Sequence, residues 1–287
     1  MAAVKRPLPD GRLHLQHGPI DLLIQAWGTQ QQVEKAHALA WERFHDLLED
    51  LVSEIGLLRT PVAEPYPLAR GPVARRMVAA VWPHRATFVT PMAAVAGAVA
   101  DEILHAMLAS NPLAKAYVND GGDIAVHVSP GERLDAGIVE ALDQPAIRSS
   151  VRIDSPCGIA TSGWRGRSQS LGIADAVTVL ARNAAEADAA ATLIANAVDV
   201  EHPAILRRPA RAVKEDSDLG ERLVTVKVGQ LPEAAAQQAL RNGLAVAERM
   251  QAGRLIESAY LAVQGCAVVL AGPGLEQRDI AFTLRRP

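Results

Sequence analysis

The stretch of residues 159–196 constrains the fold most, because its character changes twice over a short length. Residues 161–172 are rich in Ser and Gly and nearly free of aliphatic side chains, which indicates a loop. Residues 176–181 form a short apolar run with β-branched side chains, typical of a buried strand. From Ala184 the sequence is Ala-rich without Gly or Pro, so we expect a helix with Asn183 as its N-cap.

Two residues on that expected helix form a candidate metal site. Asp188 and Thr192 are four positions apart, so a carboxylate and a hydroxyl project from one face about one turn from each other. Hard oxygens placed in this way can hold Mg²⁺ beside a phosphate. The alternative is that Asp188 interacts with the helix dipole near the N-terminus and Thr192 bonds back to a backbone carbonyl.

Composition places the chain among ordinary globular proteins of one large or two modest domains. It has 287 residues, of which 49% are hydrophobic, 21% are charged and only 3% are aromatic, so the core must consist of Ala, Val, Leu and Ile. A net charge of −3 argues against a nucleic-acid partner, for which a clustered basic face is expected. The arginines occur instead as isolated pairs suited to one phosphate, namely Arg75 and Arg76, Arg165 and Arg167, and Arg207 and Arg208.

We expect a cytoplasmic protein that does not enter the membrane. Residues 1–12 lack the apolar region of a secretory signal, and no run approaches the roughly 18 apolar residues of a membrane span. Cys157 and Cys266 form no CxxC or zinc spacing, which indicates two reduced thiols. The Ala-rich helix faces are also compatible with a homodimer.

The first third of the chain predicts a hairpin followed by helices. Extended runs at residues 12–16 and 21–27 flank turn residues, and apolar residues at helical spacing over 31–58 predict one long helix that packs on a sheet. Pro72 opens a further helix to Trp82. Residues 91–110 begin with small side chains, which fit either the close approach of another backbone or a flat ligand, or a tightly packed helix.

A second hairpin is predicted around Asn119, Asp120, Gly121, Gly122 and Asp123. Apolar runs lie on both sides, and two glycines supply the positive φ angles that a tight turn needs. The functional alternative is that the glycines let a cofactor approach while Asn119 or Asp123 bonds to its hydroxyls.

The rest of the chain completes an α+β pattern, with helices on one side of a mainly antiparallel sheet. We treat residues 1–287 as one domain with an internal division near residues 130–150, where polarity rises. The remaining expected elements are strands at 223–228, 256–263, 266–270 and 280–284 and a helix at 231–250.

Four motifs, taken in order, resemble the ApbE superfamily, whose characterised members move FMN from FAD to a Thr of a partner flavoprotein with Mg²⁺. The family has a small-residue helix start, an Asn-x-Gly-Gly-Asp turn, a Thr-Ser-Gly segment and an Ala-Asp-Ala-x-Ala-Thr helix. The matching segments are residues 90–101, 119–123, 160–163 and 187–192. The resemblance implies a duplicated T-fold in which Asp188 and Thr192 bind the metal.

An uncharacterised branch of that superfamily resembles the chain over nearly its full length. This branch shares Pro-Met-Ala-Ala-Val-Ala-Gly at residues 91–97, Ser-Asp-Leu-Gly at 217–220 and Gln-Gly at 264–265. The transferases follow Thr-Ser-Gly with His-x-x-x-Pro-x-Thr-Gly, which is missing here, and Arg167 stands where the branch has His. Because arginine keeps its proton, Arg167 can hold an anion but is a poor proton shuttle.

Three functions are therefore considered. The first is an ApbE-like protein that binds FAD, or another nucleotide, with Mg²⁺ and transfers a flavin or nucleotidyl group to an acceptor flavoprotein. The second is a non-catalytic accessory protein of a redox or sulfur-metabolism enzyme, and the third is another reaction on the same scaffold. The candidate residues are Arg167 and Ser168 for catalysis and phosphate contacts, Asn119, Gly121, Gly122, Asp123, Thr161, Ser162 and Gly163 for the cofactor, and Asp188 and Thr192 for the metal.

Overall fold

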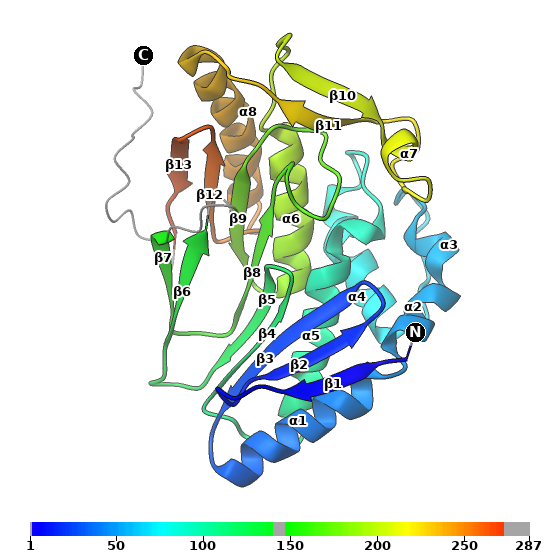
Figure 1. Ribbon diagram of the computed structural model, residues 1–287, viewed down its shortest axis with the longest axis vertical. Coiled ribbons are helices and arrows are strands. Elements are labelled where there is room, and N and C mark those ends of the chain that lie inside the picture. Colours follow the sequence, from blue (N-terminus) through cyan, green and yellow to red (C-terminus); the bar gives the residue numbers. More distant parts are fainter. Residues whose placement is uncertain (1, 140–146, 273–287) are drawn as a thin grey trace. The chain divides into compact units, whose positions relative to one another are not determined.

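A computed structural model describes residues 2–139 and 147–272 (Figure 1). The chain divides into two compact units that alternate along the sequence. Unit 1 comprises residues 1–134, 153–160 and 181–189, and unit 2 comprises residues 135–152, 161–180 and 190–287. The expected single domain with a division near residues 130–150 stays a prediction.

Unit 1 contains an antiparallel arrangement of strands, which includes a hairpin near the N-terminus. Leu13, Leu15, Leu22 and Ile24 are fully buried on one face, as the alternating pattern predicts. The predicted turn of this hairpin is confirmed, with Gly18 at φ 56°. The strands lie in the order β1 (Val4–Pro7), β2 (Leu13–His17), β3 (Ile20–Trp27), β4 (Lys115–Asp120), β5 (Asp123–Val128) and β8 (Cys157–Ser162), of which β1 and β8 were not predicted.

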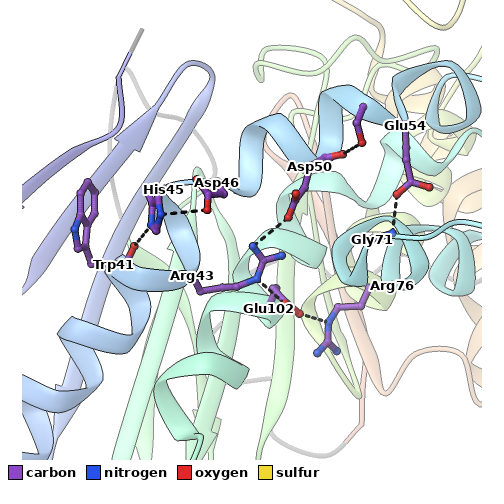
Figure 2. Close-up of polar contacts among 10 residues, drawn as sticks. Trp41, Arg43, His45, Asp46, Asp50, Glu54, Gly71, Arg76 and Glu102 are labelled. Atoms are coloured by element: carbon purple, nitrogen blue, oxygen red, sulfur yellow. Dashed lines mark hydrogen bonds and ion pairs between the residues drawn. The ribbon is translucent and has the colours of Figure 1, made fainter.

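The helices of unit 1 correct one prediction. Residues 31–58 do not form a single helix, because the chain breaks after Phe44 and at Glu54. The Glu54 carboxylate accepts the N–H groups of Arg70 and Gly71, each at 2.7 Å, and so holds the segment that leads into α4 (Pro72–Val81). Figure 2 shows the bond to Gly71. The helices are α1 (Gln30–Phe44), α2 (Leu47–Ser53), α3 (Ile55–Leu58), α4 (Pro72–Val81), η1 (Trp82–His84), η2 (Pro91–Ala94) and α5 (Val95–Leu108).

Helix α5 is the central helix of unit 1. It packs against β4, β5 and α1 (Figure 1). Within the described residues, Pro91–Leu108 is the one helical stretch long and apolar enough to cross a membrane, with a mean hydropathy of 1.3. However, 56% of this stretch is buried inside the protein, as in a core helix, and it includes Asp101 and Glu102.

Unit 2 contains a second set of antiparallel strands. The predicted buried strand is confirmed as β9 (Ala176–Ala181), which is buried at every position and pairs with β12 (Ser258–Val263). Strand β12 also pairs with β13 (Cys266–Leu270) through a turn at Gln264 and Gly265, both with positive φ. Strands β6 (Leu134–Val139) and β7 (Ile147–Ile153) pair, as do β10 (Ile205–Pro209) and β11 (Leu223–Val228).

Three helices complete the described chain. The predicted helix is confirmed as α6 (Ala184–Ala197), which, like β8, begins in unit 1 and ends in unit 2. Helix α7 (Ala210–Val213) is short, and α8 (Glu233–Ala252) packs on β12 and β13 close to its predicted bounds. The α+β architecture with a mainly antiparallel sheet is thus confirmed. The strand expected at residues 280–284 lies outside the described residues.

Candidate functional site

The glycine hairpin has the geometry that the sequence predicts. Strand β4 ends at Asp120, β5 begins at Asp123, and the two residues between them have φ angles of 66° and 115°. Asn119 Oδ1 accepts the N–H of Gly122 at 2.8 Å and so closes the turn from the side. The turn therefore uses the amide oxygen of Asn119, while its NH₂ group is the part that can donate to a ligand.

Strand alternation separates the polar residues of this hairpin. Side chains on a strand alternate between its two faces, so Asp120 shares a face with the buried Ala116 and Val118 and is only 4% exposed. Asn119 projects from the opposite face. Asp123 pairs directly with Asp120 and therefore shares its face. Asp120 was not among the predicted site residues. Its alternation with the apolar Ala116 and Val118 was the signal that could have revealed a buried carboxylate.

The beginnings of α5 and α6 cap each other through two carboxylates. Asp188 on α6 accepts the N–H of Gly97, on the first turn of α5, at 3.1 Å to Oδ2. Asp101 on α5 accepts the N–H groups of Ala184 and Ala185, the first residues of α6, at 3.0 and 2.9 Å. We call this arrangement the reciprocal cap. It satisfies backbone donors that each helix would otherwise leave unpaired.

Two glycines make the reciprocal cap sterically feasible. A Cβ atom on Gly97 would lie 2.2 Å from the carbonyl oxygen of Ala184, and one on Gly158 of β8 would lie 2.1 Å from the Ala184 nitrogen. The small residues of α5 thus serve the close approach of another backbone, one of the two expectations for this segment. The predicted N-cap is also confirmed, since Asn183 Oδ1 accepts the N–H of Glu186 at 2.9 Å.

Negative charge is concentrated around the reciprocal cap. Burial raises the pKa of Asp188 to about 7, against the opposing hydrogen bond from Gly97, and the charges of Asp120 and Asp101 raise it further. Burial likewise raises the pKa of Asp101 to about 6, although two backbone N–H groups favour its charged form. We call Asp101, Asp120 and Asp188 the acidic junction. Asp188 nevertheless remains partly exposed, so an ion could reach it.

An ion-pair network secures α5 beside the acidic junction (Figure 2). Glu102 is nearly buried, and its carboxylate accepts Arg43 Nε at 2.9 Å and Arg76 Nε at 3.1 Å. Burial opposes the ionisation of Glu102, but these two arginines hold its pKa below the ordinary value. Arg43 also donates to Asp50 at 3.3 Å, so α1 and α4 meet at one carboxylate of α5, and Arg43 links α2 to this network.

The Thr-Ser-Gly segment belongs partly to a strand, which corrects the predicted loop over residues 161–172. Thr161 and Ser162 end β8, and the Thr161 hydroxyl lies 2.9 Å from the hydroxyl of Thr178 on β9. Gly163 follows, and a Cβ there would be 2.4 Å from the carbonyl oxygen of Asp175. Cross-strand pairing of the two threonines therefore extends regular structure into a sequence that composition alone describes as a loop.

The loop after Gly163 is held by hydrogen bonds at Gln169 and is exposed before that residue. Gln169 accepts the Ser217 hydroxyl at 2.5 Å and donates to the Ala210 carbonyl at 2.9 Å. Arg167 and Ser168 lie in the exposed part. The Ser-Asp-Leu-Gly segment that begins at Ser217 thus holds the loop, a contact that its turn composition did not reveal.

The structure groups the predicted residues into two sets. Asn119, Gly121, Gly122, Asp123 and Asp188 belong to unit 1, whereas Thr161, Ser162, Gly163, Arg167, Ser168 and Thr192 belong to unit 2. Asp188 and Thr192 lie one turn apart on α6, as predicted. The convergence of both sets on one pocket stays a prediction. In residues 2–139 and 147–272, no three or more His, Cys, Asp or Glu side chains are grouped to hold a metal ion.

A family model and several curated proteins match this chain. A family model described as AbpE bacteria matches residues 5–269. The UPF0280 protein of Methanopyrus kandleri is 38% identical over 143 residues, which cover 48% of this chain and 56% of that protein. The UPF0280 protein of Archaeoglobus fulgidus is 31% identical over 180 residues, with 60% and 73% coverage. The chain spans about half the length of the first curated relatives it matches.

Solved structures resemble the chain more distantly. The apbe protein of Thermotoga maritima covers 94% of this chain and 96% of its own at 12% identity, with a TM-score of 0.46. The apo flavinyl transferase ApbE of Pseudomonas stutzeri covers 94% and 93% at 14% identity, with a TM-score of 0.42. TM-scores this low support no inference about the present site.

Proposed function

Since the chain belongs to the AbpE bacteria family and, with the UPF0280 proteins, to the ApbE-like superfamily, we propose that it binds a flavin nucleotide, FAD or a related phosphorylated ligand, together with Mg²⁺. The observation that carries this proposal is the placement of Asp188 on α6, where its carboxylate accepts the N–H of Gly97 and lies one helical turn before Thr192. Burial and the charges of Asp120 and Asp101 raise the pKa of this carboxyl group. A carboxylate whose charge is disfavoured by burial and by two like charges becomes favourable when a cation joins it.

The residues present fit a magnesium ion in their chemistry. Asp188 supplies a carboxylate oxygen, and Thr192 supplies a hydroxyl one helical turn later. Two protein oxygens can be enough for Mg²⁺, because this ion keeps several waters and uses substrate phosphates as ligands. When bound, the metal would neutralise charge on the pyrophosphate of the ligand.

The remaining roles follow from the groups that each residue exposes. Thr161 and Ser162 present hydroxyls at the end of β8, and Gly163 would offer its backbone to the ligand directly after them. Arg167 and Ser168 would receive phosphate oxygens, for which a planar guanidinium is well suited. At the hairpin, Gly121 and Gly122 leave the turn without side chains. There, Asn119 Nδ2 and Asp123 would bond to ribose or ribityl hydroxyls.

FAD binding and turnover can be tested separately. Purified protein is mixed with FAD and Mg²⁺, binding is followed by flavin fluorescence, and AMP release is measured by chromatography. Asp188→Ala should abolish the magnesium-dependent part of binding. Glu186→Gln on the same helix is the matched control, because Glu186 forms an ion pair with the exposed Arg182 and is not one of the proposed ligands. Absence of FAD binding by the wild-type protein would exclude the proposal.

A second candidate function is ligand binding without turnover, as an accessory protein to a redox or sulfur-metabolism enzyme. The residue that favours it is Arg167, because a permanent cation can hold phosphate but cannot exchange a proton near neutrality. Binding of FAD without AMP release, also in the presence of a flavoprotein acceptor, would identify this function. Cytoplasmic location belongs to both proposals and is supported by the reduced thiols of Cys157 and Cys266.

A further inference from the structure

A tryptophan directly follows the Thr-Ser-Gly segment. Trp164 is one of only four tryptophans in a chain with 3% aromatic residues, and its side chain is partly exposed. Its indole N–H donates to Asp175 Oδ1 at 3.1 Å, and its backbone N–H donates to the Ala174 carbonyl at 3.0 Å. The ring is therefore held by its polar edge while part of its apolar surface remains accessible.

The carboxylate that holds the indole is itself fixed. Asp175 Oδ2 accepts the N–H of Gln264 at 2.6 Å, and the backbone N–H of Asp175 donates to Ala262 at 2.9 Å. These bonds join the loop to β12 and to the turn that follows it. Because both carboxylate oxygens have donors, the indole cannot turn without breaking a hydrogen bond to a charged group, which is among the stronger kinds.

A cation lies beside this ring. The Arg165 guanidinium is 5.0 Å from the centre of the Trp164 ring and 3.8 Å from Asp175 Oδ1. An arginine in this position can stay over an aromatic face or stack on a planar ligand. The loop therefore combines an aromatic surface with a cation, directly next to Ser162 and Gly163.

From this geometry we infer that Trp164 is the stacking surface for the planar aromatic ring of the ligand. The inference rests on the proposed function and deepens it, because it makes the flavin ring, and not only the phosphates, a group that this loop recognises. A ring fixed before binding loses little conformational freedom when the ligand stacks on it, so the contact adds both affinity and selectivity for flat molecules.

The test compares a ligand that has a ring with one that has none. Binding of FMN and of inorganic pyrophosphate, each with Mg²⁺, is measured by calorimetry for the wild type, Trp164→Leu and Trp164→Phe. We expect Trp164→Leu to weaken FMN binding roughly tenfold and Trp164→Phe to retain most of it. Pyrophosphate affinity should change less than about twofold, because neither variant alters a phosphate contact.

Trp27→Leu is the matched control, because Trp27 is also partly exposed beside a cation, with Lys115 Nζ 5.4 Å from its ring centre, but pairs with Lys115 at the opposite end of β4 from the glycine hairpin. It should leave FMN binding unchanged. Equal losses of FMN and pyrophosphate affinity in Trp164→Leu would show that the tryptophan only braces the loop and would overturn the inference, as would undiminished FMN binding. If the wild type binds no flavin, the proposed function fails first and the inference fails with it.

Discussion

Replacement of Asp188 by asparagine offers a direct test of the acidic junction. The amide keeps the shape of the side chain, and its oxygen can still accept the N–H of Gly97, but it carries no charge. In the wild type, the pKa of Asp188 rises from the ordinary 3.8 to about 7 on folding. This difference corresponds to roughly 4 kcal/mol, an upper limit because buried sites relax around a charge.

The sign of the effect follows from the direction of the pKa change. Because the folded protein holds this proton more tightly than the unfolded chain, the Asp188 contribution is most favourable below about pH 4 and is lost as pH rises towards 7. Asp188→Asn does not titrate, so its stability does not fall with pH for this reason. The free energy of unfolding of Asp188→Asn minus that of the wild type should therefore increase by up to ~4 kcal/mol between pH 4 and pH 8.

Urea denaturation at several pH values, followed by circular dichroism, measures this difference. Comparing the variant with the wild type at each pH cancels the titration of other groups. Glu34→Gln serves as the control and should show no such trend, since Glu34 is exposed on α1 and its carboxylate accepts the side-chain amide of Gln30. A difference between Asp188→Asn and wild type that stays constant to within about 0.5 kcal/mol from pH 4 to pH 8 would refute the reasoning.

Two further changes test the surroundings of the junction. Gly97→Ala should lower the free energy of unfolding by about 3 kcal/mol in urea denaturation, because the new methyl group would lie 2.2 Å from the Ala184 carbonyl oxygen, and unchanged stability would contradict the packing described. Glu102→Gln should cost about 2 kcal/mol at pH 7, because it removes the carboxylate charge that pairs with both Arg43 and Arg76. Since the pKa of Glu102 is lowered in the fold, this cost should shrink as pH falls towards 3, and an equal cost at both pH values in the same assay would argue against the ion pairs.

Sequence reasoning predicted those features whose signals are local. Gly121 and Gly122 between two apolar runs specify a tight turn by their φ angles alone. Asn183 caps α6 because the donor it satisfies is only three residues away. The family motifs likewise placed Asp188 and Thr192 on one helix, since a spacing of four residues fixes their relation.

The features that sequence reasoning missed depend on partners distant in the chain. The helix over residues 31–58 breaks at Glu54, and the carboxylate of that residue binds the backbone N–H of Gly71, a distant contact that no periodicity in the helix can reveal. Asp101 was known only as the last residue of a motif, yet it caps a helix that begins at Ala184. Strand β1 was missed because it is a short edge strand that is exposed at every position, so its sequence lacks the alternation of apolar and polar residues.

The contacts of Gly97 and Gly158 place a condition on how this protein can diverge. Both glycines lie against the peptide units at residues 183–185, so a larger side chain at either position would push the first turn of α6 and move the carboxylate of Asp188 with it. A steric clash at one glycine cannot be removed by a substitution at the other. Each added Cβ atom would meet backbone atoms, which are the same whatever side chain is present. Descendants of this chain that retain the placement of Asp188 must therefore retain both glycines, whatever ligand they come to bind.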